Sequence, residues 1–371
     1  MKSFDEIGAA VVGTGFIGAV HVDALRRLGV QVHGVVGSSH ERASARAREA
    51  GLPPAYTTFE TMLADKRVDV VHITSPNHLH HRHAKAALEA GKHVVCEKPL
   101  AMTSVESADL VRVAEKSGLV HAVNYNLRFY PVCQHVHGMV AGDALGDVRL
   151  VSGHYLQDWL LDDSDWNWRV DPAQGGELRA VGDIGTHWMD LTSFLLGKKI
   201  DSVMADLATF IERRKGHEVT TDDAATILVR YQGGARGAFA VSQVSPGRKN
   251  SLVFEIDGAK SSAAWNSERP DELLIGHRGR PNEVLLRDPA ILNEDGRRGT
   301  WLPGGHAEGF GETFKALYAA VYRAVGEGRP AAGYPTFADG HDAMLVLEAV
   351  ARSSKEQRWV DVERSVRAGA R

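Results

Sequence analysis

The chain has 371 residues, of which 43% are hydrophobic and 24% are charged, and 43 Lys and Arg against 47 Asp and Glu give a formal net charge of −4. This composition is typical of a globular protein in water, and the length favours two domains. The near balance of charge argues against nucleic-acid or membrane partners, and no run of residues is apolar over the length of a membrane span. The two cysteines, Cys96 and Cys133, are too few for a disulfide framework. We therefore expect a cytoplasmic protein.

The first informative pattern is a glycine-rich turn near the start of the chain. The apolar run Ala9–Val12 predicts a strand and Ile17–Leu28 predicts a helix, and the glycines between them follow the spacing GxGxxG. The first glycine permits a tight turn, the second lets backbone amides approach a pyrophosphate, and the third lets the helix pack close to the sheet. The pattern predicts a dinucleotide site at Gly13, Thr14, Gly15, Phe16, Ile17 and Gly18.

Strand-like and helix-like segments alternate up to residue 125. The predicted strands are Ala9–Val12, Val30–Val36, Val68–Thr74, Lys92–Cys96 and Leu119–Val123. The predicted helices are Ile17–Leu28, Glu41–Ala50, Thr58–Ala64, His81–Ala90 and Ser104–Ser117. This alternation favours an α/β domain over residues 1–125, a Rossmann-type doubly wound parallel sheet with ligands at the carboxyl ends of its strands.

In such a domain the end of the second strand faces the adenosine ribose. A carboxylate at this position bonds the 2′-hydroxyl of NAD, but here Ser38 and Ser39 follow the strand, and the first arginine is Arg42. Small hydroxyl groups can bond a ribose or a 2′-phosphate, so the pattern leaves NAD and NADP open, with a slight preference for NAD. The serines can at the same time cap the helix that follows.

The third strand is followed by a polar turn at Ser75, Pro76 and Asn77. The nicotinamide half of a dinucleotide passes this end of the sheet, although the same residues are also ordinary turn formers. A group of histidines follows whose spacing matches no familiar zinc pattern, so no metal is expected there. These are His78, His80, His81 and His83.

The fourth strand ends at Cys96, expected to be a small buried thiol, and is followed by Glu97, Lys98 and Pro99. A lysine at a strand end, beside a carboxylate and before a rigid proline, is well placed to meet a bound cofactor. A Glu-Lys pair at a surface turn is the alternative.

After residue 125 strands come in series, which predicts a mostly antiparallel open sheet flanked by helices, an α+β domain over 126–371. The predicted strands are Val148–Gln157, Ser202–Ile211, Ala224–Tyr231, Ala235–Val244, Leu252–Asp257, Ser261–Trp265 and Glu272–Ile275. The predicted helices are Thr186–Leu196, Glu308–Gly326 and Phe337–Ser354. The segment Arg278–Gly305, rich in Gly, Pro and charge, is expected to be a long surface loop.

Two groups of residues in this second region could carry chemistry. Asp183 and His187 are spaced to share one face at the start of a helix, and histidine suits proton transfer near neutral pH. A helix cap and a polar helix face are the plain alternative. Residues 154–169 concentrate aromatic and acidic side chains, including Tyr155, Asp158 and Trp159, which suit a polyol ring or, for any one tryptophan, core packing.

The motifs together resemble the Gfo/Idh/MocA oxidoreductase family, named after glucose–fructose oxidoreductase and inositol dehydrogenase. They are GTGFIG, then Ser75-Pro76-Asn77 with His80, then Glu97-Lys98-Pro99, and in the second half Gly182-Asp183-Ile184-Gly185-Thr186-His187. The resemblance implies that Lys98, Asp183 and His187 are catalytic. It places Arg169 near the nicotinamide and a segment like that around His306 on the substrate side, where His306 could also be a cap neighbour. Arg128, at the domain crossover, is a further candidate for substrate binding.

The sequence therefore predicts an NAD(P)-dependent oxidoreductase that acts on a sugar or polyol, with its site between the two domains. His187 would take the hydroxyl proton, Lys98 would stabilise the alkoxide, and Asp183 would hold the ring hydroxyls and the imidazole. Some relatives are NAD-dependent glycosidases that use transient oxidation, and others are dinucleotide-sensing regulators, so these remain the alternatives. The resemblance also implies a homo-dimer or homo-tetramer that assembles through the open sheet.

Overall fold

The computed structural model describes residues 1–364, and packing divides the chain into two compact units. Unit 1 comprises Met1–Tyr130 and Glu308–His341, and unit 2 comprises Pro131–Ala307 and the chain from Asp342 onward. The sequence predicts one change of domain at residue 125. In the structure the chain returns to unit 1 for residues 308–341.

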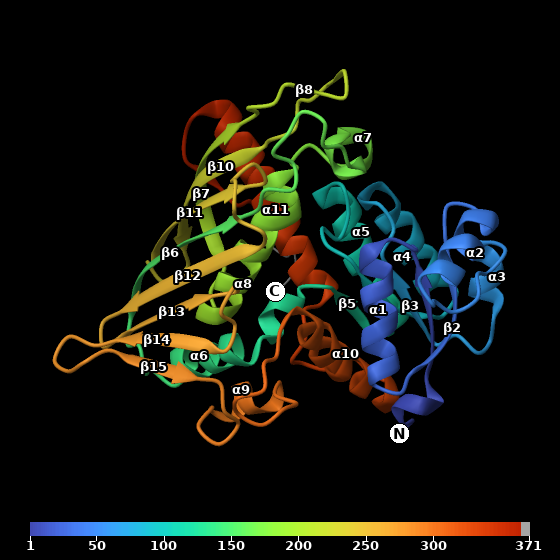
Figure 1. Ribbon diagram of the computed structural model, residues 1–371, viewed down its shortest axis with the longest axis horizontal. Helices are drawn as coiled ribbons and strands as arrows, with labels where there is room; N and C mark the ends of the chain where they lie inside the picture. The colour runs from blue at the N-terminus through green and yellow to red at the C-terminus, as the bar shows by residue number, and fades with distance from the viewer. Residues whose placement is uncertain (365–371) are drawn as a thin grey trace, which may run out of the picture. The chain divides into compact units, whose positions relative to one another are not determined.

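Unit 1 contains a five-stranded parallel sheet in the order β2-β1-β3-β4-β5 (Figure 1). Its strands are β1 (Gly8–Val12), β2 (Gln31–Val36), β3 (Val70–Ile73), β4 (His93–Cys96) and β5 (His121–Val123). Its helices are α1 (Phe16–Arg27), α2 (His40–Glu49), α3 (Phe59–Ala64), α4 (His80–Glu89), α5 (Ser104–Ser117) and α10 (Phe310–Glu327), with short 3₁₀ turns at Phe4–Glu6, Asn77–Leu79 and Asn126–Phe129. Every strand and helix predicted up to residue 125 is present, with its ends moved by no more than two residues.

The strand order explains why the sheet is covered on both faces. The chain moves from β1 outward to β2 in one direction and from β3 through β4 to β5 in the other. Because parallel crossovers are right-handed, this reversal puts α1 on one face and α4 and α5 on the opposite face. The carboxyl ends of β1 and β3, where the direction reverses, form the position at which such sheets bind ligands.

Helix α10 joins unit 1 because its apolar side packs against α1 in one hydrophobic core cluster. Val22 and Leu25 of α1 lie there with Leu317 and Val321 of α10, all of them buried. Burying side chains of this kind contributes roughly 1.5–3 kcal/mol each. The helix prediction at 308–326 is confirmed, but hydrophobic periodicity does not say which sheet a helix covers.

Unit 2 is built on a nine-stranded sheet in the order β15-β14-β13-β12-β6-β11-β10-β7-β16. The strands are β6 (Val148–Leu156), β7 (Ile200–Ala208), β10 (Ala224–Tyr231), β11 (Arg236–Ser242), β12 (Ser251–Gly258), β13 (Ser262–Asn266), β14 (Glu272–Gly276), β15 (Glu283–Leu286) and β16 (Val360–Asp361), with a separate pair β8 (Arg213–Arg214) and β9 (His217–Glu218). Only β11 and β6 run parallel among the described pairings; the others are antiparallel. The mostly antiparallel sheet predicted for this region is confirmed.

Helices lie along one face of this sheet (Figure 1). Those on this face are α6 (Pro131–Ala141), α8 (Thr186–Leu196) and α11 (Phe337–Glu356), which begins in unit 1. The unit also contains α7 (Pro172–Gly175), a π-helical turn (Val181–Gly185), α9 (Glu294–Arg298) and a 3₁₀ turn at Trp168–Val170. Trp188 of α8 stacks on Phe239 of β11 with ring centroids 4.0 Å apart, and its Nε1 donates to the Val253 carbonyl of β12 at 2.9 Å. This contact fixes α8 against the middle of the sheet.

The prediction of a surface loop over Arg278–Gly305 is wrong in part, because the segment contains β15 and α9. Strand β15 is an edge strand whose residues are mostly exposed, so it lacks the alternation of apolar and polar residues that marks a half-buried strand. Helix α9 has five residues, and Asn293 caps it by accepting a bond from the Gly296 amide at 3.0 Å. Both elements are too short for a periodic signal.

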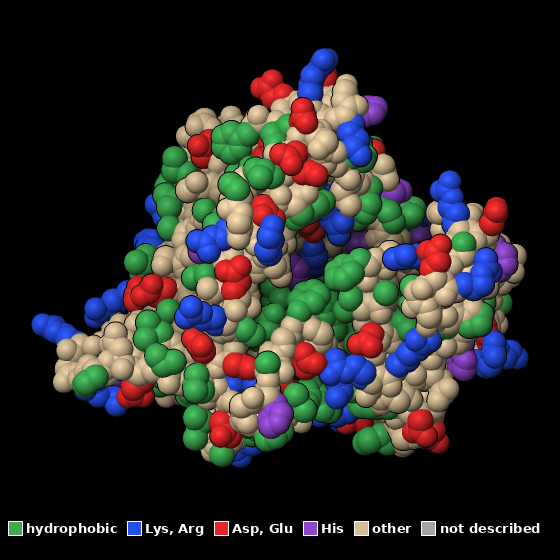
Figure 2. Space-filling model, in the orientation of Figure 1, with side chains coloured by type: hydrophobic (Ala, Val, Ile, Leu, Met, Phe, Trp, Pro, Cys, Tyr) green, Lys and Arg blue, Asp and Glu red, His purple; other side chains and the backbone are tan. Residues whose placement is uncertain are grey.

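The surface carries charges of both signs. Figure 2 shows Lys and Arg side chains interspersed with Asp and Glu over the face in view. Within residues 1–364, none of the helices combines the length and the apolar character that crossing a membrane requires.

Candidate active site

The glycine turn of unit 1 is held by close backbone contacts. Gly13 has φ +125°, and a Cβ atom there would lie 2.4 Å from Thr74 Oγ1. A Cβ atom on Gly18 would lie 2.1 Å from the Gly13 carbonyl oxygen. Only glycine at both positions lets the start of α1 pack this closely on the ends of β1 and β3.

Gly15 differs from the other two glycines because a Cβ atom there would meet nothing within 4 Å. It is the N-cap of α1, and no side chain caps this helix. The first amides of α1 lie at the positive end of the helix dipole, and Phe16 beside them is 70% exposed. This cradle fits a pyrophosphate, since a side chain at position 15 would fill the space that the phosphates need.

At the end of β2, Ser38, Ser39 and Arg42 are exposed. Ser39 caps α2, its Oγ accepting a bond from the Arg42 amide at 3.3 Å. The cap that the sequence allows is confirmed, and the contact of Ser38 and Arg42 with the ribose of a dinucleotide stays a prediction.

His80 ties the two polar turns of unit 1 together. Its Nε2 lies 2.8 Å from the Ser75 carbonyl oxygen and its Nδ1 lies 2.8 Å from the Pro99 carbonyl oxygen. Burial lowers the pKa of His80, and the two carbonyl contacts oppose that shift. Pro76 and the buried Asn77 lie in the turn that this imidazole holds in place.

The other histidines of this segment have separate partners. His81 Nε2 lies 3.0 Å from a carboxylate oxygen of Asp109, His83 Nδ1 lies 3.1 Å from Ser75 Oγ, and His78 is exposed. No group of three potential ligands that could hold a metal ion occurs in the described part of the chain.

Glu97 is buried at the end of β4 and receives several donors. Its Oε1 lies 3.1 Å from His21 Nε2 and accepts a bond from Asn124 Nδ2, while its Oε2 accepts a bond from the Lys98 amide at 3.2 Å. Lys98 itself is half-buried. Cys96, just before, is a free buried thiol whose pKa is raised by burial, as the sequence predicts for a packing residue.

In unit 2, Asp183 lies in the π-helical turn that precedes α8, and His187 lies in the first turn of α8. Asp183 Oδ1 accepts a bond from Arg169 Nε at 3.1 Å, and its Oδ2 accepts one from Gln243 Nε2 at 2.8 Å. The N-cap of α8 is Gly185, and His187 is buried, so the plain alternative of a helix cap and a polar face is wrong. Rare π-helical turns of this kind occur frequently at functional sites.

A row of polar side chains extends from Asp183 along one end of the sheet. This polar row consists of Asp183, Gln243, Gln157, Asn250 and Tyr155. Gln243 Nε2 also lies 3.5 Å from Gln157 Oε1, which accepts a bond from Trp159 Nε1 at 2.7 Å. Asn250 Oδ1 accepts bonds from Gln157 Nε2 at 2.7 Å and from the Tyr155 hydroxyl at 2.8 Å. The Tyr155 ring lies 6.4 Å from the ring of His187.

Topology explains why these residues meet. Gln157 and Gln243 directly follow the parallel strands β6 and β11, so both stand at the same end of the sheet. Asn250 directly precedes β12, which is antiparallel to β6 and therefore begins at that end. The sequence analysis missed all three, because their only signal is a position at strand ends whose pairing must be known first.

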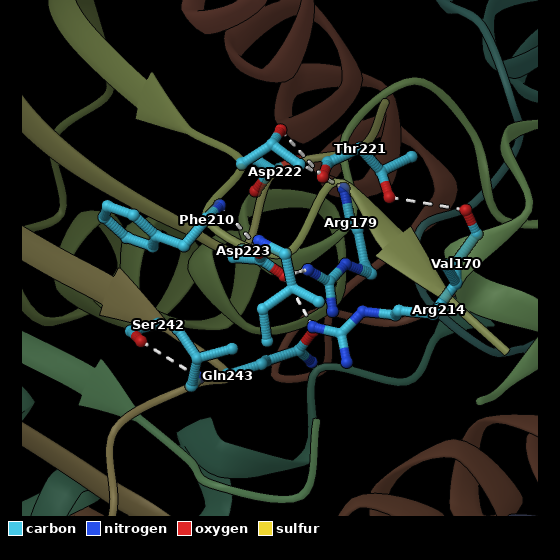
Figure 3. A network of polar contacts seen from close by, with 12 residues as sticks. Val170, Arg179, Phe210, Arg214, Thr221, Asp222, Asp223, Ser242 and Gln243 are labelled. Carbon is cyan, nitrogen blue, oxygen red and sulfur yellow. Dashed lines mark hydrogen bonds and ion pairs between the residues drawn. The ribbon is translucent and has the colours of Figure 1, made fainter. Parts of the chain in front are cut away.

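Behind this row, the segment that leads to Asp183 is anchored by a buried charged cluster (Figure 3). Asp222 accepts bonds from the amides of Arg179 at 2.6 Å and Val181 at 2.8 Å. Asp223 forms ion pairs with the guanidinium groups of Arg179 and Arg214, and all three side chains are fully buried. Burial raises the pKa of Asp222 to about 6, against the effect of the backbone bonds it accepts.

Three of the residues predicted to bind substrate have their hydrogen bonds and ion pairs with partners outside the polar row. Arg128 donates to Asp339 at 3.1 Å within unit 1. Asp158 forms an ion pair with Lys249 at 2.7 Å, and this bond lowers its pKa. His306 is exposed in a turn of unit 2, with Nδ1 3.3 Å from the Gly304 carbonyl oxygen. These three residues are not part of the polar row.

A glycine cradle at the reversal point of a parallel sheet, together with a second unit of helices on a large open sheet, defines a dinucleotide-binding protein of the Rossmann class. Residues 7–125 match the model of an oxidoreductase family with an NAD-binding Rossmann fold, and residues 133–264 match the model of the GFO/IDH/MocA C-terminal domain. The chain belongs to the Gfo/Idh/MocA family of oxidoreductases. The resemblance seen in the sequence is therefore confirmed.

Named relatives agree with this membership. The chain is 31% identical to levoglucosan dehydrogenase of Pseudarthrobacter phenanthrenivorans, over 96% of this chain and 98% of the relative. It is also similar to the solved structure of levoglucosan dehydrogenase in complex with NADH and levoglucosan, with a TM-score of 0.90 and 30% identity over 96% of this chain and 99% of that one. An inositol dehydrogenase homolog from Azotobacter vinelandii in complex with NAD+ has a TM-score of 0.86 and 28% identity, over 96% and 97% of the two chains.

Proposed function

We propose that the protein is an NAD-dependent dehydrogenase that oxidises a hydroxyl group of a sugar or a related polyol. The observation that carries the proposal is the polar row of unit 2, in which Asp183 and His187 stand beside amide and phenol groups. A polyol needs several hydrogen-bond partners in a fixed pattern, and such a row supplies both donors and acceptors. The sugar and polyol dehydrogenases among the relatives support this substrate class.

Each proposed residue has a separate task. The glycine cradle would hold the pyrophosphate of NAD, and NAD would supply a hydride acceptor for the oxidation of the reacting hydroxyl group. His187 takes the proton of that hydroxyl as a general base, and the ammonium group of Lys98 stabilises the alkoxide as it forms. Asp183, held by Arg169 and Gln243, accepts a bond from a neighbouring hydroxyl of the sugar.

Substitution of Lys98 tests this assignment. We expect Lys98→Met to lower kcat by about 10²–10⁴, the usual contribution of such a group, while the dissociation constant for NADH changes by less than about threefold. Lys66→Met, which removes an exposed lysine of unit 1, is the matched control and should keep full activity. Initial rates with a panel of sugars and with NAD and NADP give the readout.

The same assay separates the proposal from the glycosidase alternative. A dehydrogenase accumulates NADH in proportion to the sugar oxidised. Cleavage of an aryl glycoside with catalytic NAD and without net NADH would instead identify a glycosidase. Full activity of Lys98→Met would remove Lys98 from the mechanism.

We also propose that the outer face of the unit 2 sheet is covered by a second copy of the chain. One row across the sheet exposes apolar side chains: Met204, Leu228, Leu274 and Val284 are 37–61% exposed. They form two pairs, Met204 with Leu228 and Leu274 with Val284, on either side of Ser152 and Glu255. Exposed apolar side chains gathered on the open face of a sheet favour an interface. Light scattering coupled to size exclusion tests this: Leu228→Glu should yield monomers, and a wild-type monomer would refute it.

A further inference from the structure

Unit 1 contains a chain of fully buried polar groups that the mechanism above does not use. The Tyr322 hydroxyl of α10 lies 2.9 Å from His72 Nε2 of β3. His72 Nδ1 lies 3.0 Å from His21 Nδ1 of α1, and His21 Nε2 lies 3.1 Å from Glu97 Oε1. Tyr322, His72 and His21 are each 0% exposed. Polar groups buried this deeply persist only when they are bonded to one another.

The direction of donation in this series of hydrogen bonds follows from its last member, Glu97. An ionised carboxylate can only accept, so His21 Nε2 carries a proton and donates to Glu97. In the tautomer of His21 that carries its proton on Nε2, Nδ1 accepts from His72 Nδ1, and His72 accepts at Nε2 from the Tyr322 hydroxyl. Burial lowers the pKa of His72 and raises the pKa of Tyr322, so both stay neutral near pH 7. One direction of donation therefore satisfies every member.

This hydrogen-bonded series joins the dinucleotide cradle to the turn after β4 that carries Lys98. His21 lies in the second turn of α1, the helix whose first amides form the cradle. Glu97 accepts a hydrogen bond from His21 at Oε1 and another from the Lys98 amide at Oε2. A single imidazole thus connects the helix that faces the phosphates with the residue before Lys98.

We propose that His21 is a positioning residue for Lys98. By donating to Glu97, it fixes the carboxylate that holds the backbone of Lys98, and His72 and Tyr322 fix the tautomer and the orientation of its ring. The inference rests on the role proposed for Lys98 and adds that this role depends on a donor at the Nε2 position of residue 21.

Two substitutions of His21 separate its two bonds. In His21→Gln the side-chain amide nitrogen takes the place of Nε2 and can still donate to Glu97. In His21→Asn the amide reaches only the place of Nδ1, and the bond to Glu97 is lost. We expect His21→Asn to lower kcat by about 10- to 100-fold, as misplacement of a reacting group does, and His21→Gln to recover most of that loss. KM for the sugar and the dissociation constant for NADH should change by less than about threefold in both variants.

A pair of tyrosines on α10 supplies a second test if His21→Asn fails to fold. The Tyr318 ring packs against His21 and His72 at centroid distances of 5.1 and 4.8 Å, but its hydroxyl has no hydrogen-bond partner within residues 1–364. Tyr322→Phe removes the bond to His72 and should lower kcat by about 3- to 10-fold. Tyr318→Phe, the matched control, should leave kcat unchanged.

Each outcome is decisive. Unchanged kcat in His21→Asn, equal losses in the Asn and Gln variants, or equal effects of the two tyrosine substitutions would overturn the positioning role. If Lys98→Met itself keeps its activity, the role proposed for Lys98 fails instead, whatever the His21 variants do.

Discussion

The buried ion pairs of Asp223 offer the sharpest test of how unit 2 is held together. Its Oδ1 pairs with Arg179 and with Arg214, and its Oδ2 accepts bonds from the amides of Phe210 at 2.7 Å and Ile211 at 2.8 Å. Asp223→Asn keeps the shape but removes the charge, and it turns an NH₂ group toward donors. Two buried guanidinium groups then lose their shared carboxylate, and Asp222 remains as a nearby negative charge for Arg179.

The size of the effect can be worked out from this geometry. Breaking a buried ion pair by removing one partner costs about 3–5 kcal/mol, because the remaining charge stays buried. For a unit of this size, 1 kcal/mol shifts Tm by about 2–4 °C, so we expect Asp223→Asn to lower Tm by about 6–20 °C. Differential scanning calorimetry at pH 7 measures the shift.

The control removes a carboxylate from an exposed ion pair of the same unit. Asp143 pairs with Lys260, and both side chains are more than half exposed, so Asp143→Asn should cost less than about 1 kcal/mol. If Asp223→Asn lowers Tm no more than Asp143→Asn does, the buried cluster does not carry the charges described here.

The remaining predictions concern the glycine cradle and the acid stability of unit 1. Gly18→Ala should lower both Tm and dinucleotide affinity, since its methyl group would collide with the Gly13 carbonyl, whereas Gly15→Ala should lower affinity alone, since its methyl group enters open space; thermal shift with and without NADH distinguishes the two. Burial lowers the pKa of His121 to about 4, and its Nδ1 accepts a bond from the Phe337 amide at 3.2 Å. Because the unfolded state binds this proton more readily, stability falls as pH drops from about 6.5 to 4, by about 3 kcal/mol. Urea unfolding at pH 7 and pH 4 should show a loss that is about 3 kcal/mol smaller in His121→Asn than in the wild type, because other buried histidines contribute equally to both.

The parts of the fold that the sequence predicts well are those with local causes. The alternation of strands and helices up to residue 125 follows from hydrophobic periodicity, and the glycine turn follows from contacts within a short stretch of chain. Lys98, Asp183 and His187 could be proposed because each lies in a recognisable local motif at the end of a strand or the start of a helix.

Other features depend on contacts that no local pattern encodes. Gln157, Gln243 and Asn250 meet only because β6 and β11 run parallel and β12 runs antiparallel to β6. Likewise, α10 belongs to unit 1 because of its packing against α1, which lies nearly the whole chain length away. Sequence reasoning could predict each element but not its neighbours.

Glu97 and Asp183, two carboxylates of the proposed site, are held in the same way. Glu97 accepts a hydrogen bond from His21 of α1, and Asp183 accepts hydrogen bonds from Arg169 and Gln243. The donors of each carboxylate therefore come from separate parts of the chain. A carboxylate can only accept, and its donors therefore determine its orientation. It follows that the rate of the proposed reaction depends on side chains such as His21 and Gln243, which contact the motif carboxylates but lie outside both motifs in the sequence. A search for the residues that set activity in this chain must include them.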